Sequence, residues 1–412
     1  MKDETASHDR RQQRRVKRRR VIYVHGFDPA PSERYRRLIA RAGADRGGEP
    51  PAMTPVGSIS PVSQGWRITA RSEGEAVETV FEILRYEDVV RHWQRRPWPE
   101  RFWTGFGSLA RFVASGGWWR TFHLAKGPAG LFFHPVFMLA TFLFTGLTAG
   151  RLLGELAESF GAPDWSSQLG RLVGLGVGIW VSLRLERVFF AHLMLALFDF
   201  MIRVAEGKPP LGRLAARIDA FADRIVECVA EANLNKVDEI LIVGHSLGGL
   251  VATHALAQAI ERDVDLGGGR AKLSFLTLGS VAGFVACRQG VGAEDYSRSA
   301  LRIASTEDVA WVDVSSPRDW FSFGLVDPLL LTDAPPREAR SPLVISAKFG
   351  KFQPDPEDKR TRFRAMGLHM KYLAAPDRAG GFDFFAVAAG GQTLANRFET
   401  RRNSPKARML IS

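Results

Sequence analysis

The chain of 412 residues is 45% hydrophobic and 24% charged, a balance that is typical of a folded protein and excludes a disordered one. Its length predicts either one enlarged domain or two domains. Two cysteines, Cys228 and Cys287, are too few for a disulfide framework, lack the spacing of metal ligands and favour a reducing compartment. The formal net charge of +12 is unevenly spread, because residues 10–20 hold eight Arg or Lys and no acid.

The basic block belongs to an N-terminal segment, residues 1–20, that we expect to be a disordered, solvated tail. Such a tail can also contact an anionic membrane, where each basic residue contributes on the order of 1 kcal/mol. No recognition motif or interleaved aromatic residues accompany it, so no nucleic-acid partner is expected. The apolar stretch that follows, residues 21–27, is too short for a secretory signal.

Residues 21–92 have the pattern of the first part of an α/β core. In chain order, we expect a strand at 21–24, a helix at 32–42, a loop at 43–65, and strands at 66–70 and 77–86. The first strand ends in the sequence His-Gly-Phe, residues 25–27.

The composition changes in residues 93–204, which we predict to be an insertion. Five tryptophans lie between positions 93 and 119, and the twenty residues 131–150 carry no charge, enough to span a bilayer. A second apolar region, 172–183, is only twelve residues long and is followed by the charged stretch 184–187. Two interpretations stay open. The insertion is a membrane hairpin with both ends cytoplasmic, or it is a cap of buried helices over the active site.

The pattern of an α/β core resumes in residues 205–412. We expect a helix at 211–232 and strands at 239–243, 273–278, 300–303, 309–314 and 343–347. The alternation of strands and helices predicts a mostly parallel sheet flanked by helices.

The clearest catalytic signal is Ser246, which lies between Gly244 and Gly248 in a G-x-S-x-G pattern. An apolar strand precedes this pattern and a helical pattern at 250–260 follows it. A sharp strand-to-helix turn of this kind exposes the serine hydroxyl above the sheet. We therefore predict that Ser246 is a nucleophile.

A serine hydroxyl needs a base to accept its proton, and the base needs an acid to orient it. In a strand–turn–helix site of this kind the base follows the nucleophile and the acid in the chain. His369 is the only histidine beyond His254, and elimination leaves it as the base. For the acid, Asp319 in the loop after a late strand is favoured over Asp313, which lies within that strand, because ligands meet the carboxyl ends of strands.

The oxyanion of the tetrahedral intermediate needs fixed N–H donors, each contributing roughly 3 kcal/mol. The backbone N–H of Leu247, directly after the nucleophile, is one candidate. The N–H of Phe27 is the second, since the loop after an early strand usually supplies it and Gly26 permits a close approach.

Together, the motifs VIYVHGF, ILIVGHSLGG, SSPRDW and GLHMKYL resemble the α/β-hydrolase superfamily, and within it the serine esterases and lipase-like members. The resemblance covers residues 21–92 and about 205–375. It implies an α/β-hydrolase fold and cofactor-free acyl transfer from Ser246 through an acyl-enzyme, with no metal. The hydrophobic insertion departs from the pattern of this superfamily and argues against an ordinary water-soluble substrate.

We therefore expect a membrane-associated serine hydrolase with a cytoplasmic catalytic domain, acting on an ester or thioester of an apolar acyl substrate. Its expected partners are a lipid or acyl-ester substrate and membrane lipids. The alternative is a non-catalytic membrane-anchored scaffold that keeps the fold without the activity. The complete Ser, Asp and His set argues against this alternative, but fold alone does not fix function.

Overall fold

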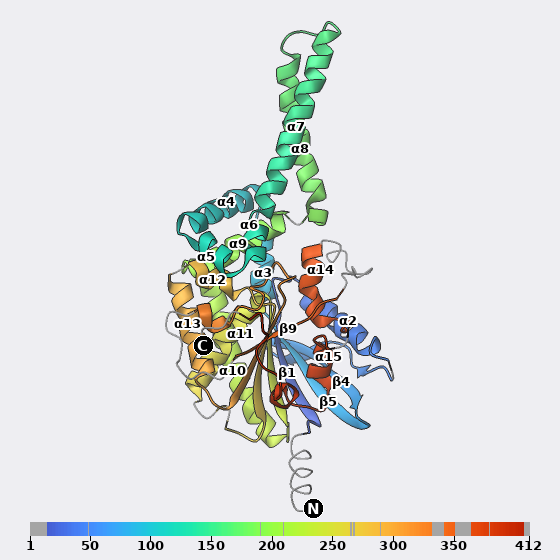
Figure 1. Ribbon diagram of the computed structural model, residues 1–412, viewed down its shortest axis with the longest axis vertical. Coiled ribbons are helices and arrows are strands. Elements are labelled where there is room, and N and C mark those ends of the chain that lie inside the picture. Colours follow the sequence, from blue (N-terminus) through green and yellow to red (C-terminus); the bar gives the residue numbers. More distant parts are fainter. Residues whose placement is uncertain are drawn as a thin grey trace, which may run out of the picture.

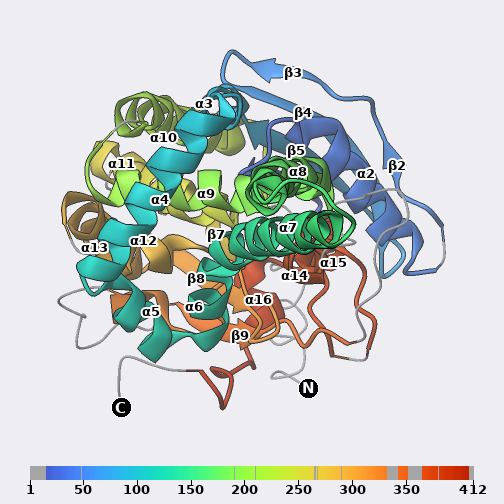
Figure 2. The ribbon, with the colours of Figure 1, turned by 90° about the horizontal axis from the view of Figure 1, so that it is seen from above.

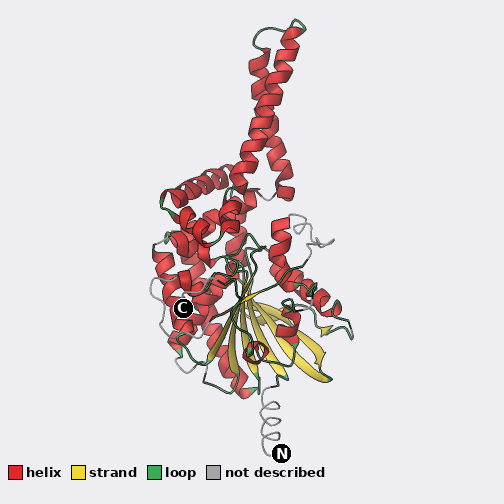
Figure 3. Ribbon diagram, in the orientation of Figure 1, coloured by secondary structure: helices red, strands yellow, loops and turns green. Residues whose placement is uncertain are grey.

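The computed structural model describes residues 15–407 except positions 48, 190, 209, 264, 265, 267, 289, 332–341, 351–363 and 379. It is an α/β structure with a mixed, mostly parallel sheet flanked by helices (Figures 1 and 3). The strands are β1 (Arg18–Val24), β2 (Ala52–Met53), β3 (Gly57–Ser60), β4 (Ser63–Ser72), β5 (Glu75–Leu84), β6 (Glu239–His245), β7 (Lys272–Leu278), β8 (Val309–Ser315) and β9 (Leu343–Ser346).

The strand order is β2-β4-β5-β1-β6-β7-β8-β9, with β3 paired to β4. All pairs from β5 to β9 are parallel, whereas β2, β3 and β5 pair antiparallel to β4. Because parallel strands end at one edge, the loops after β1, β6 and β8 come together there. These loops carry the HGF sequence, Ser246 and Asp319.

Helices cover both faces of the sheet. They are α2 (Pro31–Ala44), α3 (Glu87–Gln94), α10 (Leu211–Leu234), α11 (Leu247–Arg262), α12 (Ala282–Arg288), α13 (Val291–Ala304), α14 (Arg364–Met370), α15 (Phe384–Ala389) and α16 (Leu394–Phe398), with short 3₁₀ turns at Pro328–Leu331 and Lys371–Leu373. Side chains alternate along β1, so Ile22 and Val24 pack on the α10–α11 side, and Val21 and Tyr23 pack on the α2–α15 side. Each face therefore has its own apolar core.

The predicted tail is wrong at its C-terminal end, because β1 begins at Arg18. Residues 1–14 lie outside the described residues. The Arg19 side chain is fully buried and pairs with Glu239 at 2.7 Å, Nε to Oε2. It also donates to the carbonyls of Gly390 and Gln392. A buried charge persists when it is paired and hydrogen-bonded, so Arg19 is part of the core and not of a solvated tail.

Two other element predictions are wrong. The expected loop at 43–65 contains β2, β3 and the start of β4, because its small residues form an antiparallel extension of the sheet. The expected strand at 300–303 is the last turn of α13, where Tyr296, Ala300 and Ile303 are buried at helical spacing. A four-residue apolar run does not distinguish a strand from one buried helical face.

The region predicted as an insertion contains α4 (Trp98–Ala114), α5 (Gly117–Leu124), α6 (Lys126–Phe132), α7 (His134–Ser159), α8 (Ser166–Phe189) and α9 (Ala191–Ala205). Helices α7 and α8 form a long antiparallel hairpin that projects from the body, while α4, α5 and α6 lie to one side of its base (Figures 1 and 2). The charged residues at 184–187 interrupt the apolar pattern but not the helix, which runs on to Phe189.

Candidate active site

Ser246 lies in the tight turn between β6 and α11. Its φ of 58° and ψ of −122° are rarely adopted by residues with side chains. The flanking glycines make this turn possible. A Cβ on Gly248 would lie 2.0 Å from the carbonyl oxygen of Val24, and one on Gly244 would lie 2.7 Å from that of Gly248. The sequence therefore lifts the Ser246 hydroxyl above the end of β6.

The HGF loop after β1 closes against this turn. A Cβ on Gly26 would lie 3.0 Å from Cβ of Ser246, so a larger residue here would press against the serine. Beneath the loop, His25 stacks on Tyr86 with ring centroids 4.3 Å apart. The Tyr86 hydroxyl donates hydrogen bonds to the carbonyls of His25 and Gly26. These contacts fix the loop where Phe27 follows Gly26.

Two backbone N–H groups, those of Leu247 and Phe27, are candidates for an oxyanion site. Leu247 is the first residue of α11, where an N–H has no partner inside the helix. The N–H of Phe27 donates to no other backbone group within the described part of the chain. Leu247 directly follows Ser246 in the chain, and Phe27 directly follows Gly26, which lies against Ser246.

His369, on α14, is held by Asp319 from the loop after β8. Its Nδ1 lies 2.9 Å from Oδ2 of Asp319. The same oxygen accepts a hydrogen bond from the Tyr372 hydroxyl at 3.0 Å, while Oδ1 accepts from the backbone N–H of Phe321 at 3.0 Å. A carboxylate only accepts, so the Nδ1 of His369 carries the proton. Its Nε2 is then the basic nitrogen.

The Nε2 atom of His369 is buried and has no hydrogen-bond partner among the described residues. His369 and Ser246 line the same cleft, whose empty space is about 550 Å³ when the open solvent at its mouth is included. No hydrogen bond joins their side chains, as is common in unliganded sites whose contacts tighten around substrate. The other lining residues are Gly26, Phe27, Asp28, Arg34, Tyr35, Leu193, Met194, Leu197, His245, Phe321, Met366 and Met370.

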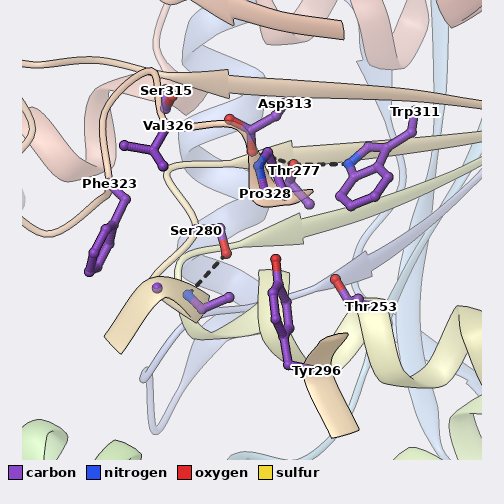
Figure 4. Close-up of a pocket in the computed structure, with 12 residues that line it drawn as sticks. Thr253, Thr277, Ser280, Tyr296, Trp311, Asp313, Ser315, Phe323, Val326 and Pro328 are labelled. Carbon is purple, nitrogen blue, oxygen red and sulfur yellow. Dashed lines mark hydrogen bonds between the residues drawn. The ribbon is translucent and has the colours of Figure 1, made fainter. Parts of the chain in front are cut away.

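Asp313, the alternative acid, lies elsewhere. Its Oδ1 accepts a hydrogen bond from the Thr277 hydroxyl at 2.6 Å, and the Trp311 indole donates to that same hydroxyl at 3.3 Å (Figure 4). These groups line a separate small polar cavity with Tyr296 and Ser280. Burial raises the pKa of Asp313 to about 7, against the effect of hydrogen bonds from Thr277 and Ser315. Asp319, and not Asp313, therefore contacts His369.

His245, directly before the serine, supports the histidine from below. Its ring stacks on that of His369 with centroids 5.1 Å apart, and its Nε2 lies 3.2 Å from the His369 carbonyl oxygen. Burial, followed by the proximity of His369, lowers the pKa of His245 to about 3. It is therefore neutral near pH 7 and adds no charge that would oppose protonation of His369.

Helix α9 covers the cleft and connects it to the hairpin. Its residues Leu193, Met194 and Leu197 line the cleft. The loop that carries Asp319 lies against α6. A Cβ on Gly127 of α6 would be 3.0 Å from Cδ1 of Trp320, the residue after Asp319. The buried-cap interpretation thus describes α9, while α7 and α8 remain exposed.

Sequence reasoning missed Tyr372, His245 and Tyr86 as supports of the site. A signal for Tyr372 was present, because it follows His369 by three residues, close to one helical turn. No comparable signal marked Tyr86, whose contact with His25 joins positions 61 residues apart. Such pairs become neighbours only when the sheet forms.

Within the described part of the chain, no cluster of His, Cys, Asp and Glu could hold a metal ion. No protein-family model matches the sequence, and no curated protein or solved structure matches it either. Function is therefore inferred from the arrangement of the residues themselves.

Proposed function

We propose that this protein is a serine hydrolase with an α/β-hydrolase fold, which cleaves an ester or thioester of an apolar acyl substrate and associates with membranes. One observation carries the proposal. Residues distant in sequence converge at one cleft: Ser246 in its strained turn, and His369 with Nδ1 bonded to Asp319 and Nε2 unpaired. A nucleophile, an oriented base and an acid are the elements of acyl transfer.

The chemistry follows from these positions. Nε2 of His369 accepts the Ser246 proton as Oγ attacks the substrate carbonyl carbon, and the resulting oxyanion is stabilised by the N–H groups of Phe27 and Leu247. The protonated His369 then gives that proton to the leaving oxygen or sulfur, and an acyl-enzyme remains. Water, deprotonated by His369, attacks the acyl-enzyme and releases the acid. Asp319 accepts the hydrogen bond from Nδ1 of His369 throughout and stabilises the imidazolium.

The substrate class follows from the cleft walls. Apart from the catalytic groups and the Asp28–Arg34 ion pair, the lining is dominated by Leu, Met and Phe side chains. Such a wall offers favourable burial to an acyl chain, at about 0.8 kcal/mol per methylene. A charged or sugar-like acyl group would lose hydration there without gaining partners.

The test is hydrolysis of a chain-length series of p-nitrophenyl esters in detergent. We expect kcat/KM to rise as the acyl chain lengthens, until the cleft is filled, and Ser246→Ala to remove hydrolysis at every length. Ser299→Ala is the matched control, since Ser299 bonds to His254 on the far side of α11 and should leave activity unchanged. Hydrolysis by Ser246→Ala at the wild-type rate would contradict the proposal.

A further inference from the structure

The α7–α8 hairpin exposes an apolar surface that nothing in the described part of the chain covers. Its exposed side chains include Phe137, Phe144, Leu153, Phe160, Leu172 and Val173. The stretch Lys126–Ser159 is the one described helical segment whose length and composition suit a membrane crossing, and only 22% of its most apolar window is buried. A contiguous apolar surface of this kind marks an interaction site.

The two helices pack against each other through their glycines. The glycine-lined faces are therefore buried between the helices and cannot bind another partner. A Cβ on Gly150 would lie 2.0 Å from the Gly170 carbonyl oxygen, and one on Gly174 would lie 2.1 Å from that of Gly146. Glycines at four-residue spacing on both helices therefore permit backbone contact, as in helix pairs packed inside membranes. The large side chains consequently point outward on all sides of the hairpin. Only a solvent that surrounds the hairpin can contact all of them.

The charges divide the hairpin into an apolar band with two polar ends. Helix α7 is 26 residues long, which gives about 39 Å at 1.5 Å per residue. It carries no charge from Pro135 to Gly150, and α8 carries none from Leu172 to Leu183. These stretches cover roughly 24 and 18 Å. The long side chains of Arg151, Arg171 and Arg184 can extend the band toward the ~30 Å of a bilayer core.

Aromatic residues lie near both ends of the band. Phe160 and Trp165 flank the tip loop, and Trp180 lies one turn before Arg184, whose guanidinium is 5.2 Å from its ring. Tryptophan concentrates at membrane–water interfaces. This distribution matches a hairpin that crosses the bilayer completely, with a polar tip beyond it.

A second surface, on one side of the hairpin base, is suited to lipid headgroups. We call the exposed sides of α4, α5 and α6 the cap face, and Figure 2 shows it on the side of the body from which the hairpin projects. Trp103 is 72% exposed and Trp119 is 56% exposed. Between Trp98 and Phe133 the sequence has four Arg or Lys and one acid, Glu100. An aromatic and basic surface fits an acidic membrane.

From these observations we propose that the α7–α8 hairpin crosses a lipid bilayer twice, with residues 160–165 on the far side, and that the cap face contacts acidic headgroups of the near leaflet. This inference rests on the membrane association proposed above but not on the chemistry of Ser246. It places the cleft under α9 close to the membrane surface, so a lipid-borne ester reaches Ser246 from the bilayer.

Site-specific labelling tests the crossing without catalysis. Ser159→Cys places a thiol near the tip, and Ser58→Cys places one on the exposed strand β3 of the body. Burial raises the pKa of Cys228 to about 12 and of Cys287 to about 11, so the native thiols react little. In sealed membrane vesicles of the two orientations, an impermeant maleimide should label the tip thiol in one and the body thiol in the other. Labelling of both from the same side would overturn the crossing.

The cap face is tested with Ala110→Cys, an exposed position two turns after Trp103 on α4. A nitrobenzoxadiazole dye at this thiol should be quenched by headgroup-level nitroxide lipid in phosphatidylcholine vesicles containing phosphatidylglycerol, and less without it. The same dye at Ser58→Cys should not be quenched. Equal quenching at both sites would reject cap-face contact, and self-association without vesicles would identify a second chain as the occupant. Loss of ester hydrolysis with intact labelling would instead contradict only the enzymatic proposal.

Discussion

The body and the α7–α8 hairpin place polar and apolar groups in opposite ways. In the body, buried polar groups such as Asp319, Tyr372 and His369 bond to one another across long sequence separations, while apolar residues fill two cores. In the hairpin, backbone contacts between glycines occupy the inside and large apolar residues lie outside. This difference supports the proposal that lipid, and not water, surrounds the hairpin.

The largest expected effect comes from removing the base from the body. His369→Ala should lower kcat by about 10⁴-fold or more, because members of a triad act as a unit. Asp319→Asn should cost somewhat less, about 10³- to 10⁴-fold, by disturbing the histidine tautomer. Asp313→Asn is the matched control, since Asp313 bonds to Thr277 and not to His369. Ester hydrolysis that survives Asp319→Asn but not Asp313→Asn would reverse the assignment of the acid.

The hairpin is most sensitive at its glycine contacts. Gly150→Ile should separate the helices, because even a Cβ would lie 2.0 Å from the Gly170 carbonyl oxygen. In detergent micelles, trypsin should then cleave at Arg151 and Arg171 roughly tenfold faster, as local opening exposes the backbone. The control is Gly176→Ile, whose Cβ meets nothing within 4 Å. Equal cleavage of the two variants would show that the glycine contacts do not hold the hairpin.

A smaller effect concerns pH and the buried Asp313. Its pKa is raised to about 7 by burial, so the folded state binds its proton more tightly than the unfolded chain does. This stabilisation is complete below the unfolded pKa of about 4 and is lost as pH rises toward 7, by up to about 1.4 kcal/mol per pH unit. In urea unfolding experiments, the free energy of unfolding of Asp313→Asn should therefore fall less with rising pH than that of the wild type. A variant with the wild-type pH slope would place the titration elsewhere.

The smallest expected effect is that of Tyr372→Phe. It removes one hydrogen bond to Oδ2 of Asp319 and leaves the bond from His369. A hydrogen bond to a charged group contributes about 1.5–3 kcal/mol. Because His369 and the Phe321 N–H still donate to Asp319, only part of this is lost, and we expect kcat to fall roughly 3- to 10-fold. The loss should appear in kcat and in the acidic limb of the pH–rate profile, with KM unchanged. A change in KM alone would mean that Tyr372 acts on substrate binding.

Much of the site could be predicted because its motifs are local. The glycines around Ser246 were readable from their spacing, and His369 was assigned by elimination as the only histidine beyond His254. The sequence left both Asp313 and Asp319 open as the acid. They lie six residues apart, and they differ only in whether they come before or after the turn at the end of β8. The structure separates them through the bond from His369 to Asp319.

The fold was predicted less evenly. Apolar strands such as β6 and β8 were found where expected, whereas β2 and β3 are short and owe their conformation to pairing with β4. Arg19 looked like part of a charged tail, because nothing near it in sequence reveals its partner Glu239, 220 residues away. The continuity of α8 through residues 184–187 was equally hidden by their charge.

Active-site labelling shows directly whether Ser246 is an activated nucleophile. The purified full chain in detergent is treated with a fluorophosphonate, which phosphonylates an activated serine by displacing fluoride, and the modified peptide is located by mass spectrometry. We expect one modified residue, Ser246, no modification of Ser246→Ala, and strongly slowed modification of His369→Ala. Modification at another serine with unchanged labelling of Ser246→Ala would contradict this expectation.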